Sequence, residues 1–325
     1  MQSLMYNKKV MIKSLSKTKN LVEEAIKRVI LESTPERKDE LEQLWNEYSP
    51  NFILYDDKPG FSMETAFGSV LFTNRTMQAI WILGFAAWKA SYCFLVPLKL
   101  LQTANQNLNV KVFNELPDQS EAESLYANLI NSMKELVNIN RLNEFRWPAH
   151  IPKPYDGKPK DIEGSVIFDL TCMATAYIFL HEIQHLKFRQ EGKIDLDSED
   201  EELLCDEFAR KMLLDNLDRY SKESGYPLEK LKTKRAMSIA FASFLLLVIT
   251  PKQSWGGTRS HPSITRRIEE LAQSIQLPEN DIFWIYLSCL TLAHLRYEKC
   301  FLHEISFSSQ KDLCLKLIGY IERPR

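Results

Sequence analysis

The chain has 325 residues, 45% of them hydrophobic and 26% charged, so it can bury one large core or two modest ones. Its formal net charge of −2 creates no overall field that attracts nucleic acid, and we expect no nucleic-acid partner. No charged segment followed by an apolar stretch and a small-residue cleavage site opens the sequence, which argues against a secretory signal. The six cysteines show no paired spacing, so we expect reduced thiols and a cytoplasmic location.

The first half of the chain reads as mostly helical with a small strand-prone part. Helices are predicted over residues 21–31, 37–48, 77–101 and 121–138, and strands over 52–55 and 67–73. Lys58-Pro59-Gly60 supplies a turn between the two strands. Residues 1–150 therefore form a predicted N-terminal region, mostly helical with a small β element.

Residues 77–101 are the nearest candidate for a membrane span. Lys89 falls in the middle of this stretch and Pro97 interrupts its end, so the segment is not apolar enough to cross a bilayer without cost. We predict a buried or interfacial helix and no transmembrane span. A peripheral contact of this segment with a membrane stays open.

A proline-rich stretch at residues 146–161 separates the first half from the second. Four prolines make it a loop or linker, and residues 151–325 would then form a second region. A loop draped over a cleft within one continuous domain would have the same composition, so a single domain remains an alternative.

The most informative pattern is His181-Glu182-Ile183-Gln184-His185, within a predicted helix over 167–188. Apolar residues and the two histidines recur at steps of three or four in the series Leu170, Ala174, Tyr177, His181, His185 and Phe188. Two histidines four apart share one helix face, and Glu182 lies about 100° round the axis. A bare histidine pair on such an apolar helix would be hard to satisfy, whereas a zinc ion requires neutral imidazoles in a water-poor site. His181 and His185 are thus candidate zinc ligands beside a possible base.

A third ligand is expected on the next helix, which begins near Ser198 and continues to residue 214. Ser198 and Glu201 have the spacing of a capping box, and we expect Glu199, Asp200 and Glu201 to form a solvated helix cap. Glu202 and Asp206 share a face one turn apart. We predict that Glu202 is the ligand and that Asp206 orients a ligand histidine through its other ring nitrogen. The reverse assignment stays open.

The rest of the second half adds two apolar helices, over 239–250 and 281–299. The histidines at positions 150, 294 and 303 stand outside any ligand pattern, and we predict structural roles for all three. Cys205, next to Asp206, reads as a small buried residue.

The HExxH pattern followed by Glu202-Leu203-Leu204-Cys205-Asp206 resembles the gluzincin metallopeptidases. The resemblance implies a mainly α (α+β) fold: a zincin-like core with an active-site helix, a second ligand helix and a small upstream β-sheet. It makes 151–325 the zincin-like catalytic region. It also implies an edge strand that aligns the substrate backbone, for which residues 66–73 are our candidate.

A further element, Ser260-His261-Pro262 continuing to Ile268, is similar to the His-Pro-x4-Arg-Ile segment of gluzincins of the prenyl-protein-processing and heat-shock membrane protease type. By this resemblance His261 faces the substrate carbonyl and Arg267 pairs with an acid such as Asp206. The alternative is a plain loop-to-helix entry, with Pro262 near the first turn and Arg267 on the surface.

Because no span is expected, the chain looks most like the Lit-type phage-exclusion peptidases, cytoplasmic bacterial proteins of about this size. The likeness is specific over residues 165–270. It implies a protein substrate, a host translation elongation factor that is cleaved during phage infection. A cytoplasmic enzyme that cuts an essential protein must be latent or need a trigger, so an activating or inhibiting peptide or protein is also expected.

The predicted function is therefore zinc-dependent hydrolysis of a peptide bond in a protein, with Glu182 as the base. Two alternatives make different demands on the sequence. A zinc hydrolase of the deformylase type needs a Gly-Cys-Leu ligand segment upstream, and no such segment precedes His181. A non-catalytic or latent zinc-binding interaction protein would have no use for an intact Glu182.

Overall fold

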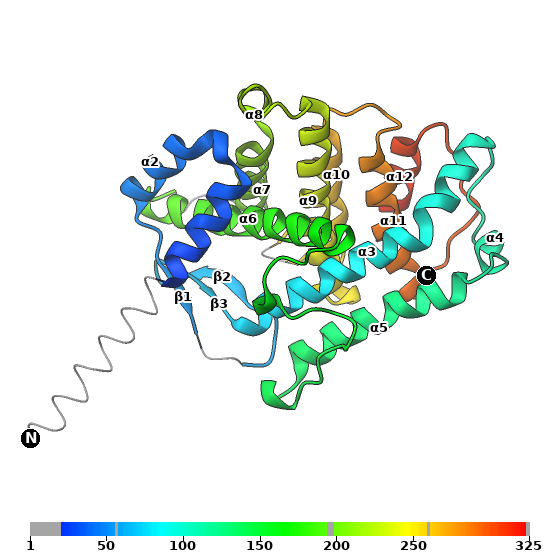
Figure 1. Ribbon diagram of the computed structural model, residues 1–325, viewed down its shortest axis with the longest axis horizontal. Coiled ribbons are helices and arrows are strands. Elements are labelled where there is room, and N and C mark those ends of the chain that lie inside the picture. Colours follow the sequence, from blue (N-terminus) through cyan, green and yellow to red (C-terminus); the bar gives the residue numbers. More distant parts are fainter. Residues whose placement is uncertain (1–20, 56–57, 194–197, 259–260, 323–325) are drawn as a thin grey trace, which may run out of the picture.

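The computed structural model describes residues 21–55, 58–193, 198–258 and 261–322 (Figure 1). Within these ranges the chain is mainly helical with one small sheet upstream of the HExxH helix, which confirms the predicted fold class. A first helix covers residues 21–33. The other main elements are α2 (Lys38–Tyr48), β1 (Phe52–Leu54), β2 (Met63–Ala66), β3 (Ser69–Phe72), α3 (Asn74–Thr103), α4 (Val110–Asn114), α5 (Gln119–Asn138), α6 (Ile162–Gln190), α7 (Ser198–Leu214), α8 (Leu217–Ser224), α9 (Leu228–Ile249), α10 (Ile264–Ser274), α11 (Ile282–Tyr297) and α12 (Gln310–Ile318).

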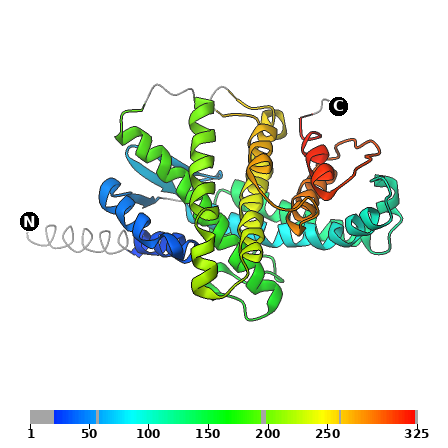
Figure 2. The same ribbon diagram turned by 90° about the horizontal axis from the view of Figure 1, so that it is seen from above.

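Helix α6 lies at the centre, and α3, α7 and α9 pack against it (Figures 1 and 2). The helix starts where the Asp161 side chain accepts a hydrogen bond from the Gly164 amide at 2.7 Å. After Gly164 it contains neither glycine nor proline, so nothing in its sequence breaks the 29-residue helix. Lys187 and Arg189 complement the dipole at its C-terminal end.

The sheet has the strand order β1-β3-β2, with β1 parallel and β2 antiparallel to β3. Phe179 of α6 packs edge-on against Phe52 and Phe72, at ring-centroid distances of 5.7 and 5.3 Å. The prediction that residues 66–73 hold the edge strand is wrong, because β3 lies in the middle of the sheet. The edge strand beside α6 is β2, whose pairing with β3 depends on contacts that the sequence pattern does not reveal.

Helix α7 is fixed at its C-terminal end by two buried arginines. Arg37 donates to the carbonyl of Lys211 at 2.9 Å, and Arg235 donates to the carbonyl of Leu213 at 2.7 Å. Arg235 also forms a buried ion pair with Glu36 at 2.5 Å. Because the last carbonyls of a helix lack partners within it, these cations satisfy them and hold the end of α7 against α9 and the segment that precedes α2.

Helix α3 runs without a break through Pro97 to Thr103, so the expected interruption at Pro97 is wrong. Both α3 and α6 are long and apolar enough to cross a membrane by length and composition, but 72% of the most apolar window of each is buried inside the fold. Core helices of soluble proteins have the same property. Gly84 lets the two helices approach closely, because a Cβ there would collide with the hydroxyl of Thr171.

One hydrophobic cluster contains residues from both sides of the loop at 146–161. Trp81 of α3 donates its indole N–H to the carbonyl of Pro152 at 2.7 Å and so ties that loop to the helical body. The division into residues 1–150 and 151–325 stays a prediction.

Candidate active site

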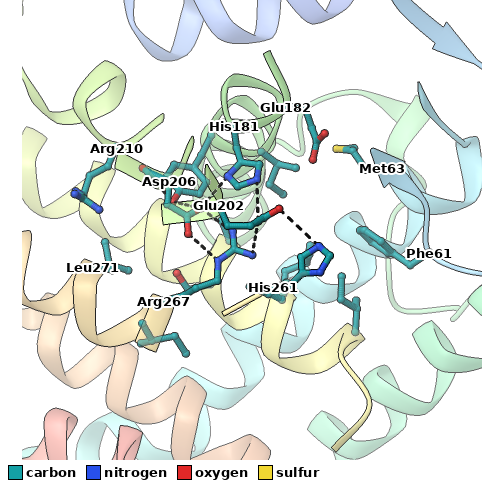
Figure 3. A pocket seen from close by; sticks show the side chains of 18 residues that line it. Phe61, Met63, His181, Glu182, Glu202, Asp206, Arg210, His261, Arg267 and Leu271 are labelled. Carbon is teal, nitrogen blue, oxygen red and sulfur yellow. Dashed lines mark hydrogen bonds and ion pairs between the residues drawn. The ribbon is translucent and has the colours of Figure 1, made fainter. Parts of the chain in front are cut away.

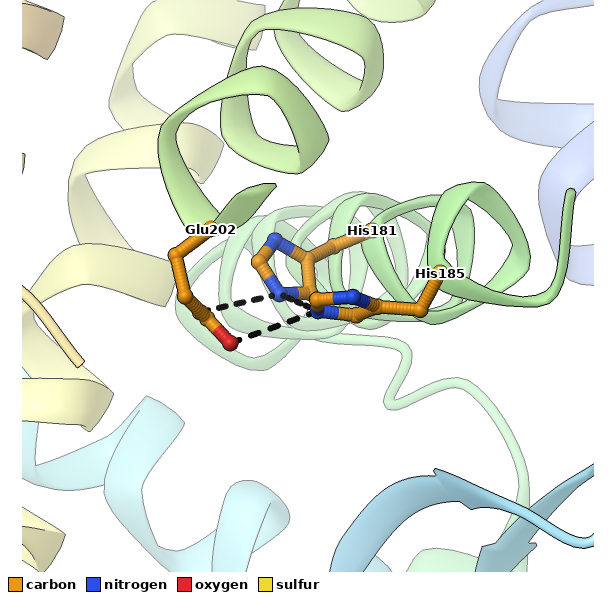
Figure 4. Close-up of side chains that lie close together, drawn as sticks. All are labelled: His181, His185 and Glu202. Carbon is orange, nitrogen blue, oxygen red and sulfur yellow. Dashed lines mark hydrogen bonds and ion pairs between the residues drawn. The ribbon is translucent and has the colours of Figure 1, made fainter. Parts of the chain in front are cut away.

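Three side chains that can bind a metal meet between α6 and α7 (Figure 4). His181 and His185 stand one turn apart on α6, and their Nε2 atoms are 3.1 Å apart. Glu202 reaches across from α7, with one carboxylate oxygen 3.4 Å from Nε2 of His181 and the other 3.3 Å from Nε2 of His185. The three ligand atoms lie within 4.8 Å of one another, so this buried group could hold a metal ion.

Asp206, one turn after Glu202, faces the other ring nitrogen of His181. Its Oδ1 accepts from Nδ1 of His181 at 2.9 Å and from the hydroxyl of Tyr177 at 3.1 Å. Arg267 donates to both oxygens of Asp206, from Nε and from Nη2, each at 2.7 Å. These contacts hold the His181 ring with Nε2 toward Glu202. The geometry therefore favours Glu202 over Asp206 as the third metal ligand.

A second carboxylate holds His185, and sequence reasoning missed it. Glu201 accepts a hydrogen bond from Nδ1 of His185 at 2.6 Å, and only 24% of its side chain is exposed. The interpretation of Glu201 as part of a solvated helix cap is therefore wrong. The signal that could have found it is chemical, because each ligand histidine needs an acceptor for its second nitrogen. Helix α7 therefore supplies the hydrogen-bond acceptors for both ligand histidines, Glu201 and Asp206, and also the third candidate metal ligand, Glu202.

The two histidine rings favour a positive charge between them. Because carboxylates accept from both Nδ1 atoms, a neutral ring carries its hydrogen there, and two neutral rings would turn their Nε2 lone pairs toward each other. Burial disfavours a charged ring, yet the hydrogen bonds to Asp206 and Glu202 outweigh it and raise the pKa of His181 to about 10. Burial also opposes the charge of Glu202, but hydrogen bonds from both histidines lower its pKa. Either a proton or a metal ion can supply the charge that the site favours.

Glu182 faces the sheet instead of α7, as its place about 100° round the helix from His181 dictates. The hydroxyl of Thr65, on β2, lies 2.9 Å from a carboxylate oxygen of Glu182 and 2.7 Å from its backbone carbonyl. Arg189, farther along α6, donates to the carbonyl of Thr65. The acidic side chain of the HExxH motif is thus held by the edge strand.

His261 lies at the exposed side of the site, shortly before the start of α10. Gly257 has φ +94°, and a Cβ there would come within 3.0 Å of the Ser263 amide, so only glycine fits. The Ser263 side chain caps α10 by accepting from the Arg266 amide. Nε2 of His261 is 3.6 Å from Glu202, and 57% of its side chain is exposed.

A cavity of about 180 Å³ opens beside these groups (Figure 3). Its polar side is lined by His181, Glu182, Glu202, Asp206, His261 and Arg267. Its apolar side includes Phe61, Met63, Ile178, Leu245, Leu246 and Leu271. A cleft with a few convergent polar groups on an apolar wall is typical of a site for a ligand with polar and apolar parts.

The residues predicted to be structural lie outside the cavity lining. His294 is buried, its Nδ1 is 3.2 Å from the hydroxyl of Tyr126, and burial lowers the pKa of His294 to about 3. His150 and His303 are exposed. All six cysteines are free thiols, and Cys205 is buried as predicted.

An HExxH helix whose two histidines meet a glutamate from the following helix defines a gluzincin-type metallopeptidase. A family profile described as Peptidase U49 matches residues 70–287, a range that holds all the side chains of the site except those of Thr65, Phe61 and Met63. The chain belongs to the Peptidase U49 family, the Lit-type peptidases. Comparison with curated proteins and with solved structures found no match.

Proposed function

We propose that this peptidase is a zinc-dependent endopeptidase of the cytoplasm, with His181, His185 and Glu202 as its zinc ligands. Two imidazoles and one carboxylate are a donor set of catalytic zinc sites, which leave a fourth position open. The observation that carries the proposal is the convergence of the three donors beside the cavity, with both histidines held by carboxylates at Nδ1. When bound, the ion would polarise a substrate carbonyl and increase the acidity of a water molecule.

Glu182 is the proposed general base. It lines the cavity next to the three donors, yet its carboxylate is bonded to Thr65 and is left out of the donor group. In the reaction Glu182 takes a proton from the water that attacks the scissile carbonyl and then gives it to the leaving amine. This transfer regenerates the carboxylate for the next cycle.

His261 and Arg267 have supporting roles in the proposal. His261 stands at the edge of the cavity with an exposed ring, where it can donate to the carbonyl oxygen as negative charge develops there. Arg267 pairs with Asp206 and lies 3.2 Å from Glu202, so it balances two buried carboxylates and keeps His181 in place through Asp206.

Strand β2 is the proposed binding edge for the substrate backbone. One side of β2 pairs with β3, and Met63 of β2 lines the cavity. An extended peptide that adds to the other side of β2 would bring its backbone past Glu182. An enzyme with such an edge can cut within a chain, which supports endopeptidase activity.

Family membership supports a protein substrate, and the resemblance to phage-exclusion peptidases makes a host translation elongation factor the proposed target. Unrestrained cleavage of that factor would stop protein synthesis in the cell that makes the enzyme. We therefore include in the proposal an activating or inhibiting peptide or protein that restricts cleavage to phage infection.

The test compares the wild type with Glu182→Gln. Metal analysis of purified protein is expected to give one zinc per chain for both, and their melting temperatures should agree. Proteomics of new peptide termini, in bacterial cells with and without phage challenge, should show termini that depend on the wild type and map to the elongation factor. New termini that map to another protein would identify that protein as the substrate in place of the elongation factor. Full activity of Glu182→Gln would remove Glu182 from the mechanism, and no wild-type-specific terminus would favour a non-catalytic zinc protein.

A further inference from the structure

The carboxylate of Glu182 is hydrogen-bonded to the hydroxyl of Thr65, which lies 117 positions earlier in the chain. Thr65 and Glu182 are both buried, at 6% and 8% exposure, so water does not readily replace the bond between them. The Thr65 hydroxyl has one proton and lies within hydrogen-bond distance of two oxygens of the same residue, the backbone carbonyl and the carboxylate. A glutamate side chain has several freely rotating bonds, and this contact selects one arrangement of them.

The backbone of Thr65 is held as well as its side chain. Thr65 stands opposite Val70 in the antiparallel pair, and the Val70 amide donates to Asn51 on the other side of β3. Thr65 therefore turns its own amide and carbonyl away from β3, toward the free edge of β2. Arg189 donates to that carbonyl. Two residues of α6 thus contact Thr65: Glu182, beside the first ligand histidine, and Arg189, near the C-terminal end of the helix.

Building on the proposed function, we propose that Thr65 is a positioning residue that aims the Glu182 carboxylate into the cleft and couples the base to the edge strand. The strand that would align a substrate backbone and the base that would act on it then keep one fixed spacing. Because both contacts come from α6, the strand cannot shift along the helix without breaking the bond to Glu182. Misplacement of a reacting group by about 1 Å can lower a rate about 100-fold, so the loss of this contact should appear in kcat.

The test uses the full-length, zinc-loaded chain with Thr65→Val, which keeps the shape and removes the hydroxyl, and Thr65→Ser, which restores it. Thr175→Val is the matched control, because Thr175 is a buried threonine of α6 whose hydroxyl, among the described residues, bonds to the Thr171 carbonyl of the same helix. Purified bacterial elongation factor is the substrate. Thr65→Val should lower kcat about 10- to 100-fold, with KM and zinc content unchanged. Thr65→Ser and Thr175→Val should stay near the wild type.

Three results would overturn the proposal: a wild-type kcat in Thr65→Val, a loss of zinc that accompanies the loss of activity, or a rise in KM at constant kcat. The last two would give Thr65 a purely structural or substrate-binding role. If Thr65→Val does not fold, Thr65→Ala takes its place. If the wild type leaves the elongation factor intact, the proposed substrate fails, and crystal structures of zinc-loaded wild type and Thr65→Val decide the positioning role. A displaced Glu182 carboxylate in the variant supports it, and an unmoved one refutes it.

Discussion

The two carboxylates that hold the ligand histidines should differ in their effect on zinc affinity. Asp206 accepts from His181, Tyr177 and Arg267, with 12% of its side chain exposed, whereas Glu201 has 24% exposed. Loss of such an acceptor usually lowers metal affinity 10- to 100-fold. Because Glu201 is the more exposed of the two carboxylates, we expect Glu201→Gln to lower zinc affinity by about tenfold, or about 1.4 kcal/mol. Asp206→Asn should cost about 100-fold.

The assay is competition for zinc against a chromophoric chelator at constant pH, with the melting temperature of the zinc-free protein recorded in parallel. Asp200→Asn is the control, because it removes the same charge from the same turn of α7 at an exposed position. It should bind zinc as the wild type does. If Glu201→Gln keeps full affinity, the contact with His185 contributes nothing. An equal loss in Asp200→Asn would assign the effect to net charge instead of to the hydrogen bond.

Three other outcomes follow from the charges in the core. Arg267→Met should destabilise the protein by about 3 kcal/mol or more in urea unfolding, because it leaves the Asp206 carboxylate buried without its cation, and an unchanged midpoint would contradict this. Because the pKa of His181 is about 10, zinc binding must displace one proton from this ring, and the apparent zinc affinity should fall about tenfold as the pH is lowered from 7.5 to 6.5. A zinc affinity that does not change with pH would show that no proton is displaced. The pKa of His294 is about 3 in the folded state and about 6.5 in the unfolded state, so between these values only the unfolded state takes up the proton. The free energy of unfolding should therefore decrease as the pH is lowered through this range, by up to about 1.4 kcal/mol per pH unit. His294→Gln should flatten that slope, and an equal slope in both proteins would rule the group out.

Local sequence patterns predicted most helices because each signal lies within a few residues. The apolar steps from Leu170 to Phe188 identified α6, and the spacing of its histidines placed them on one face. Helix α9 begins at Leu228, earlier than the predicted start at residue 239, because its first turns are polar and lack the apolar signal. Strand β2 was missed since Met63 to Ala66 show no strong strand preference, and only pairing with β3 makes them a strand.

The parts of the site that the residues alone did not reveal depend on how distant segments meet. The acids near Ser198 have a complete local explanation as a helix cap, and only the angle between α6 and α7 brings Glu201 to His185. Thr65 carries no signal at all, because a threonine on a short strand is ordinary. Arg267 is predicted only by family resemblance, and its contact with Asp206 joins residues 61 positions apart in the chain.

That separation has a consequence for synthesis of the enzyme. Translation completes the HExxH helix and α7 well before α10, so a growing chain holds its three donors before it has the guanidinium that balances Glu202 and Asp206. Two buried carboxylates without that cation disfavour the closed arrangement of the helices. A chain truncated before residue 267 lacks the cation that balances these two carboxylates, and we expect its site to be less stable than that of the full chain.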